Sequence, residues 1–229
     1  MTPNTRQRLD LAIKKRYKTS SAPTLTDLIY IKRNFLSREQ CNVIIDEFES
    51  SPLEAGQEQC RHAVTDILTR STFITQDSQI GTDSFKLIHS TIETMINDYH
   101  DYLDTFESFH VMRRGSSMLH PHKYRIMKYE KGAWIHPHVD HDTGIYGSCT
   151  INLNEDYEGG TFAFWGGLHK VKLGLGDVMI WPADYFWVHE VEEITEGTRY
   201  SANCFLCREP MHLPEECKYN IRGCEPAFT

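Results

Sequence analysis

The second half of the chain is a succession of short runs rich in aromatic and β-branched residues, and this pattern constrains the fold more than any other feature. The runs begin near residue 124 and are separated by turns that contain glycine. Many short strands at a spacing of about 8 to 12 residues are typical of a β-sandwich or jelly roll. The runs are "YRIMKYE", "SCTINLN", "TFAFW", "HKVKL", "DVMIW" and "TRYSANCFL".

The first half of the chain has the pattern of helices. Residues 37–40, "SREQ", form a capping box, and apolar residues then recur on one helical face as far as Phe48. A second apolar stripe begins at Asp83 and continues to Phe106. Because the helices come first and the strands later, the sequence predicts an α+β fold.

The predicted layout is one domain, residues 28–229, preceded by a basic arm over residues 1–27 that could be flexible. Helices over 28–110 are expected to support one side of a jelly roll over about 111–210. Residues 51–80 are polar and lack a clear period, so this segment is a candidate for a mobile loop.

Composition limits the classes of function. The chain has 229 residues and a formal net charge of −8. It has no apolar run of the ~18 residues that a membrane span needs, and no apolar leader near its N-terminus. We therefore expect a cytoplasmic protein, or one of the host cytoplasm if its source is viral. No long basic stripe follows the arm, so nucleic acid is not favoured as a partner.

Seven scattered cysteines are an odd number, and without a secretory leader reduced thiols are expected. Cys204 and Cys207 form a CxxC pair, with Cys217 and Cys224 downstream. A structural zinc site usually has tighter, paired spacing between turns, whereas this pair lies in a predicted strand. A zinc site at these four cysteines is therefore an alternative that their spacing does not favour.

The heptapeptide "HPHVDHD", residues 136–142, is the densest cluster of candidate metal ligands. On a strand, His138 and Asp140 face the same way. With His189 from a later strand they would form two histidines and one carboxylate, a set that suits non-haem Fe(II). Arg199, ten residues after His189, could then pair with a dicarboxylate. A set of three histidines including His136 would instead favour zinc.

The remaining polar residues near this cluster allow more than one interpretation. His141 and Asp142 are either a polar rim or contacts to the ligands or substrate. His120 and His122 flank Pro121 in a predicted loop before the sheet, and we expect them to face solvent.

Residues 124–206 resemble the catalytic core of the Fe(II)- and 2-oxoglutarate-dependent dioxygenases, in the prolyl 4-hydroxylase-like branch. The resemblance lies in "YRIMKYEKGAWIHPHVDHD", "SCTINLNEDYEGGTFAFW", "LGLGDVMIWP" and "VHEVEEITEGTRYSANCFL", in the family's order and spacing. It implies a double-stranded β-helix, a distorted jelly roll, with helices on one side. It also implies Fe(II), 2-oxoglutarate and O2, and L-ascorbate is a candidate additional cofactor.

The resemblance assigns roles to six positions. His138, Asp140 and His189 would bind iron, and Arg199 would bind the distal carboxylate of 2-oxoglutarate. Tyr129 and Ser148 stand where the family has a tyrosine and a threonine that contact this co-substrate. The catalytic set would be His138, Asp140, His189 and Arg199. Since Asp140 is retained, hydroxylation is favoured over halogenation.

Three positions on the substrate side bear on the choice of substrate. Asn152 replaces a usual tyrosine, Ile145 replaces an arginine, and Phe205 stands where the family often has a tryptophan. The predicted function is hydroxylation of a peptidyl prolyl residue, with release of succinate and CO2. The alternative is hydroxylation of a free amino acid or other small metabolite, and a non-catalytic metal-binding jelly roll is the third hypothesis. A peptide substrate would need a mobile loop, for which residues 61–80 are the candidate.

Overall fold

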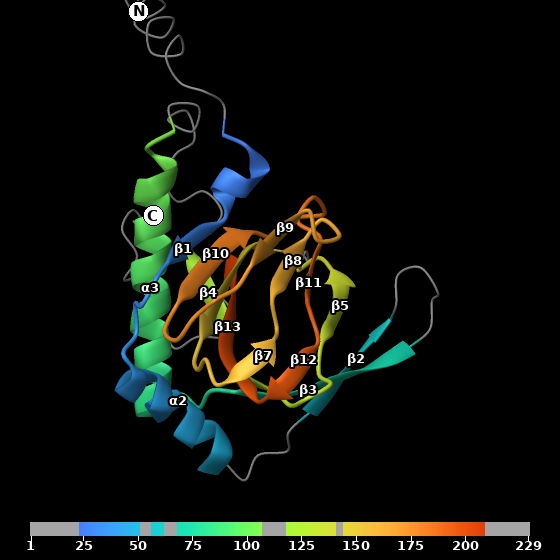
Figure 1. The fold of residues 1–229 in the computed structure, drawn as a ribbon. Coiled ribbons are helices and arrows are strands. Elements are labelled where there is room, and N and C mark those ends of the chain that lie inside the picture. Colours follow the sequence, from blue (N-terminus) through green and yellow to red (C-terminus); the bar gives the residue numbers. More distant parts are fainter. Residues whose placement is uncertain (1–22, 51–55, 62–67, 107–117, 141–143, 209–229) are drawn as a thin grey trace, which may run out of the picture.

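The computed structural model describes residues 23–50, 56–61, 68–106, 118–140 and 144–208. Two antiparallel β-sheets face each other, and two helices cover the outer side of the larger sheet (Figure 1). This arrangement confirms the predicted α+β jelly roll. Most of the basic arm and the residues 141–143 lie outside the described residues.

The larger sheet has seven strands in the order β1-β10-β6-β13-β4-β3-β2. All six of its pairings are antiparallel. The strands are β1 (Tyr30–Lys32), β10 (Val178–Pro182), β6 (Ile145–Asn152), β13 (Arg199–Cys207), β4 (His120–Tyr129), β3 (Leu68–Asp77) and β2 (Gly56–Arg61).

The smaller sheet has four strands in the order β5-β11-β8-β9. They are β5 (Ile135–His138), β11 (His189–Val191), β8 (Phe162–Phe164) and β9 (His169–Val171). A separate pair joins β7 (Tyr157–Gly159) to β12 (Ile194–Gly197). These short strands match the short runs in the sequence.

Two helices follow the short 3-10 turn η1 (Leu25–Leu28): α2 (Arg38–Ser50) and α3 (Asp83–Leu103). The capping box ahead of α2 is present, because the N–H of Ser37 donates to Gln40 Oε1 and the N–H of Gln40 donates to Ser37 Oγ. Thr82 caps α3 by accepting from the N–H of Phe85. Both helices pack on the larger sheet (Figure 1).

Two hydrophobic cores result from the alternation of side chains along the strands. On β10, Val178 and Ile180 point to the core under the helices, which also contains Ile92 of α3. Met179 and Trp181 point to the core between the two sheets. This second core surrounds the cavity described below. Among the described residues, no helix is both long and apolar enough to cross a membrane.

A loop before β10 ties the sheet to the segment that leads into α2. The carbonyl of Gly176 accepts hydrogen bonds from the N–H groups of Phe35 and Leu36. Gly176 has φ +69°, and a Cβ there would lie 2.0 Å from the carbonyl oxygen of Leu36. Only glycine fits this approach without displacing the backbone.

Within residues 51–80, the segment that could include a mobile loop, residues 56–61 and 68–77 form the strands β2 and β3. β3 pairs with β4 and extends the larger sheet. Its sequence "LTRSTFITQD" is rich in threonine and isoleucine, which favour strands despite the polar composition. The region 28–110 therefore contributes three strands as well as the supporting helices.

Candidate functional site

The side chains of His138, Asp140 and His189 meet between the two sheets. His138 ends β5 and lies directly opposite His189 of β11 in the strand register. Asp140 Oδ1 lies 3.3 Å from His138 Nε2, and Asp140 Oδ2 lies 3.5 Å from His189 Nε2. The three ligand atoms lie within 4.8 Å of one another, so this group could hold one metal ion.

Both imidazole rings are oriented by backbone carbonyls. Nδ1 of His138 lies 2.7 Å from the carbonyl oxygen of His136, and Nδ1 of His189 lies 2.9 Å from that of Trp187. A carbonyl oxygen only accepts, so each Nδ1 carries a proton; Nε2 then directs a lone pair toward Asp140 when the ring is neutral and a proton when the ring is charged. Burial also lowers the pKa of His189, which favours the neutral form that binds metals.

Asp140 is held as a carboxylate. Burial acts to raise its pKa, but the charge of His189 and hydrogen bonds from His138 and Ser148 outweigh it and leave the pKa lowered. Ser148 Oγ donates to Asp140 Oδ2 at 2.6 Å. Ser148 therefore contacts a candidate metal ligand, and its predicted contact with 2-oxoglutarate stays a prediction.

The donor set fits the Fe(II) that the resemblance implies. Two imidazoles and one carboxylate come together, and this is the donor set of the facial non-haem iron sites. Among the described residues this is the only group that could hold a metal, and it does not include His136, the member of the alternative three-histidine set. Cys204 and Cys207 are buried on β13, and Cys217 and Cys224 lie outside the described residues.

Arg199 begins β13 and is buried, with 1% of its surface exposed. Its guanidinium lies between the rings of Tyr129 and Phe162, 4.8 Å and 5.4 Å from their centroids. Nε donates to Asn152 Oδ1 at 3.0 Å. Nη1 and Nη2 are buried and have no hydrogen-bond partner among the described residues. Burying two donors of a cation without partners costs folding free energy, and a bound carboxylate would satisfy both.

Tyr129 lies opposite Arg199 in the register between β4 and β13. Its hydroxyl lies 3.6 Å from the sulfur of Met127. The structure thus places Tyr129 against the guanidinium, while its contact with a co-substrate stays a prediction.

A cavity of about 280 Å³ adjoins the candidate metal ligands. Its lining includes His138, Asp140, His189 and Ser148, together with Ile145 and Phe205. The prediction that His120 and His122 face solvent from a loop is wrong. Both belong to β4, His120 is buried, and His122 lines the cavity.

Sequence reasoning missed three residues around Arg199: Asn152 as its hydrogen-bond partner, Tyr157 and Gly160. Gly160 has φ +63°, and a Cβ there would lie 2.6 Å from Ile194 Cδ1 and 3.1 Å from Arg199 Cδ. The "EGG" turn is visible in the sequence, but only the fold shows that its second glycine leaves room for the side chains of Arg199 and Ile194.

Two imidazoles and one carboxylate brought together inside a jelly roll are the donor set that suits non-haem Fe(II). Residues 124–207 match the family model of the 2OG-Fe(II) oxygenase superfamily. The superfamily implies Fe(II), 2-oxoglutarate and O2 as the reacting partners.

A relative is a PKHD-type hydroxylase of Hyphomonas neptunium, 37% identical over 92 residues, which cover 34% of this chain and 40% of the relative. The chain thus spans less than half the length of the curated relatives it matches.

Two solved structures share the fold. One is a prolyl hydroxylase from Trichoplax adhaerens in complex with a peptide fragment of hypoxia inducible factor. It has a TM-score of 0.57 and 16% identity, with coverage of 91% of this chain and 94% of that one. The other is a Pseudomonas putida prolyl-4-hydroxylase, with a TM-score of 0.55, 16% identity and coverage of 86% and 98%.

Proposed function

We propose that this protein is an Fe(II)- and 2-oxoglutarate-dependent dioxygenase that hydroxylates a C–H bond. The observation that carries the proposal is the pair of unpaired Nη groups of Arg199, buried in the same jelly roll as the facial ligands. A purely structural metal site would not require an unpaired buried cation nearby. The same observation argues against a non-catalytic module.

His138, Asp140 and His189 would hold the metal through two Nε2 atoms and one carboxylate. Bound Fe(II) would supply the oxygen-activating chemistry of the superfamily, which couples oxidation of 2-oxoglutarate to succinate and CO2 with hydroxylation of the substrate. Ser148 orients the Asp140 carboxylate, and the carbonyls of His136 and Trp187 orient the two rings. The triad is thus fixed before anything binds.

Arg199 would bind the distal carboxylate of 2-oxoglutarate through Nη1 and Nη2. The rings of Tyr129 and Phe162 exclude water from the guanidinium, which strengthens its attraction for an anion. Tyr129 and Ser148 are further candidate contacts of the co-substrate.

A peptidyl prolyl residue is the substrate that the relatives favour, since both solved neighbours are prolyl hydroxylases by name. A smaller substrate with a carboxylate is the second candidate, and the cavity lining favours it. Lys123, Arg125 and Asn203 line the cavity. Asn203 Oδ1 accepts from Thr150 Oγ1 and Ser201 Oγ, so its NH2 group remains for a ligand acceptor.

The domain limits 28–229, the cytoplasmic location and a role for L-ascorbate belong to the same proposal. The supporting region and the jelly roll share one hydrophobic core, which is consistent with a single domain.

The first experiment adds Fe(II) and then 2-oxoglutarate to the metal-free protein under anaerobic conditions. We expect the weak visible charge-transfer band of the chelate, and its absence would contradict the proposal. The aerobic experiment compares succinate release with a proline-containing peptide, free proline and prolinamide. Peptide-dependent release supports the first substrate, whereas release with proline but not prolinamide supports the second.

A further inference from the structure

The buried side chain of Asn152 has five hydrogen-bond contacts. It lies at the end of β6, is fully buried, and stands where the resemblance leads one to expect a tyrosine. Oδ1 accepts from Arg199 Nε at 3.0 Å and from the Tyr157 hydroxyl at 3.0 Å. Nδ2 lies within hydrogen-bond distance of the carbonyl oxygens of Asn154, Leu173 and Gly174.

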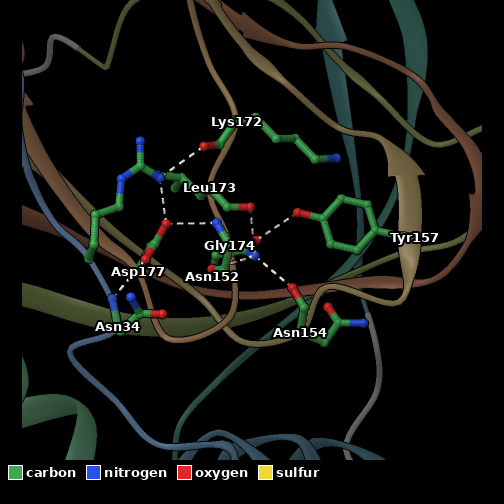
Figure 2. Close-up of polar contacts among 9 residues, drawn as sticks. Asn34, Asn152, Asn154, Tyr157, Lys172, Leu173, Gly174 and Asp177 are labelled. Atoms are coloured by element: carbon green, nitrogen blue, oxygen red, sulfur yellow. Dashed lines mark hydrogen bonds and ion pairs between the residues drawn. The ribbon is translucent and has the colours of Figure 1, made fainter.

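These contacts settle which way the Asn152 amide faces. The three carbonyl oxygens only accept, so they require the NH2 group on their side. The oxygen must then face Arg199 Nε and the Tyr157 hydroxyl, both of which can donate. A flipped amide would place the NH2 group against an arginine that has no acceptor. Figure 2 shows Asn152 between Tyr157, Asn154 and the Leu173–Gly174 backbone.

The loop that presents two of these carbonyls is itself fixed. The buried carboxylate of Asp177 accepts from the N–H of Gly174 at 2.7 Å and from the N–H of Asn34 at 2.9 Å (Figure 2). Arg33 Nη1 donates to the same carboxylate at 2.5 Å. The backbone of Asn152 also pairs with this loop, through Gly176 and Asp177.

Only one of the three guanidinium nitrogens of Arg199 has a hydrogen-bond partner among the described residues. Asn152 occupies Nε alone, while Nη1 and Nη2 stay unpaired among the described residues. A guanidinium binds a carboxylate most strongly when two parallel N–H groups face it. Fixing the third nitrogen removes rotational freedom that binding would otherwise have to remove.

We propose that Asn152 and Tyr157 are positioning residues, which hold Arg199 through Nε so that both Nη groups face an incoming carboxylate. The Tyr157 hydroxyl orients the Asn152 oxygen, and the Lys172 ammonium lies over the Tyr157 ring at 4.1 Å. This inference rests on the proposed function, because the carboxylate in question is the distal one of 2-oxoglutarate.

The test compares Tyr157→Phe with Tyr200→Phe in the full-length protein loaded anaerobically with Fe(II). The first variant removes the Tyr157 hydroxyl, which donates to Asn152. The second is the control: Tyr200 follows Arg199 in the sequence, but its hydroxyl donates to Glu49 instead. Binding of 2-oxoglutarate and of oxalate is measured by calorimetry. Oxalate binds the metal in the same bidentate manner but has no distal carboxylate.

We expect Tyr157→Phe to weaken 2-oxoglutarate binding by about three- to tenfold, the effect of one hydrogen bond. Oxalate binding should not change, and in turnover the KM for 2-oxoglutarate should rise while kcat at saturation is retained. Asn152→Ala should weaken 2-oxoglutarate binding further, by about tenfold to a hundredfold. Tyr200→Phe should bind like the wild type.

Equal weakening of 2-oxoglutarate and oxalate would overturn the positioning role, because it would indicate general damage to the site. Unchanged binding in Tyr157→Phe would overturn it as well, and this variant keeps its ring should Asn152→Ala fail to fold. A wild-type protein that binds Fe(II) but not 2-oxoglutarate would instead refute the proposed function itself.

Discussion

Replacement of Arg199 by methionine should abolish co-substrate binding and leave the stability of the metal-free protein nearly unchanged. Methionine has a similar length and no charge, and it can fill the space between Tyr129 and Phe162. The residue is buried and its two Nη groups are unpaired among the described residues. We therefore expect the variant to lose co-substrate binding while its metal-free form folds about as well as the wild type.

The magnitudes follow from the contacts. Losing the Nε hydrogen bond to Asn152 costs about 1.5–3 kcal/mol, and losing the stacking on two rings costs about 0.5–2 kcal/mol. Removing two unsatisfied buried donors returns about 2–6 kcal/mol. The losses and the gain nearly cancel at their central values, so the net change in the free energy of unfolding should lie between about 3 kcal/mol of destabilisation and about 4 kcal/mol of stabilisation. Breaking a paired buried charge costs about 3–5 kcal/mol by comparison.

For binding, the loss of two hydrogen bonds to a charged group predicts a 2-oxoglutarate dissociation constant raised by about 10² to 10⁴. Urea unfolding of the metal-free protein and anaerobic calorimetry with Fe(II) measure the two quantities. A destabilisation above about 4 kcal/mol would refute the reasoning, since it would mean that the guanidinium has a strong internal partner. Unchanged affinity would remove Arg199 from the co-substrate site.

Three other changes test separate parts of the structure. Asp140→Ala should abolish the Fe(II)–2-oxoglutarate band and turnover, and full activity would reject the ligand assignment. Gly160→Ala should destabilise the protein by at least about 1 kcal/mol and weaken 2-oxoglutarate binding. Gly160 has φ +63°, and the added methyl group would meet Ile194 and Arg199. A urea midpoint equal to that of the wild type would contradict this. Burial raises the pKa of the Cys41 thiol to about 11 from 9.0, so its contribution to stability should be constant below pH 9 and fall as the pH rises toward 11. Urea midpoints of Cys41→Ala and wild type, compared at pH 8 and pH 10, would show this as a smaller alkaline loss in the variant.

The features that the sequence predicted well are those set by local spacing. The capping box before α2 depends on residues three positions apart, and the structure has both of its hydrogen bonds. His138 and Asp140 share strand parity, and the structure brings both to His189. His189 was a candidate third member from its place after a predicted strand pair, and the resemblance assigned it the same role, but its register opposite His138 depends on how two distant strands pair.

The features that the sequence did not predict depend on contacts between distant segments. Asn152 and Arg199 are 47 positions apart, and nothing in either local pattern indicates that their side chains meet. His120 was expected in a loop because Pro121 follows it, yet the strand accommodates the proline and buries the histidine. β3 was obscured by its polar composition, which its pairing with β4 overrides.

The hydrogen bonds between Gly176 and the segment before α2 connect the region that the family model matches to residues far outside it. The matched region is 124–207, yet the loop that holds Asn152 is itself held by the Arg33 and Asn34 contacts to Asp177 and by the Phe35 and Leu36 contacts to Gly176. A fragment trimmed to the signature would keep every metal ligand and the arginine. It would lack the contacts of residues 33–36 with this loop, so we expect it to bind 2-oxoglutarate more weakly than the chain that includes them.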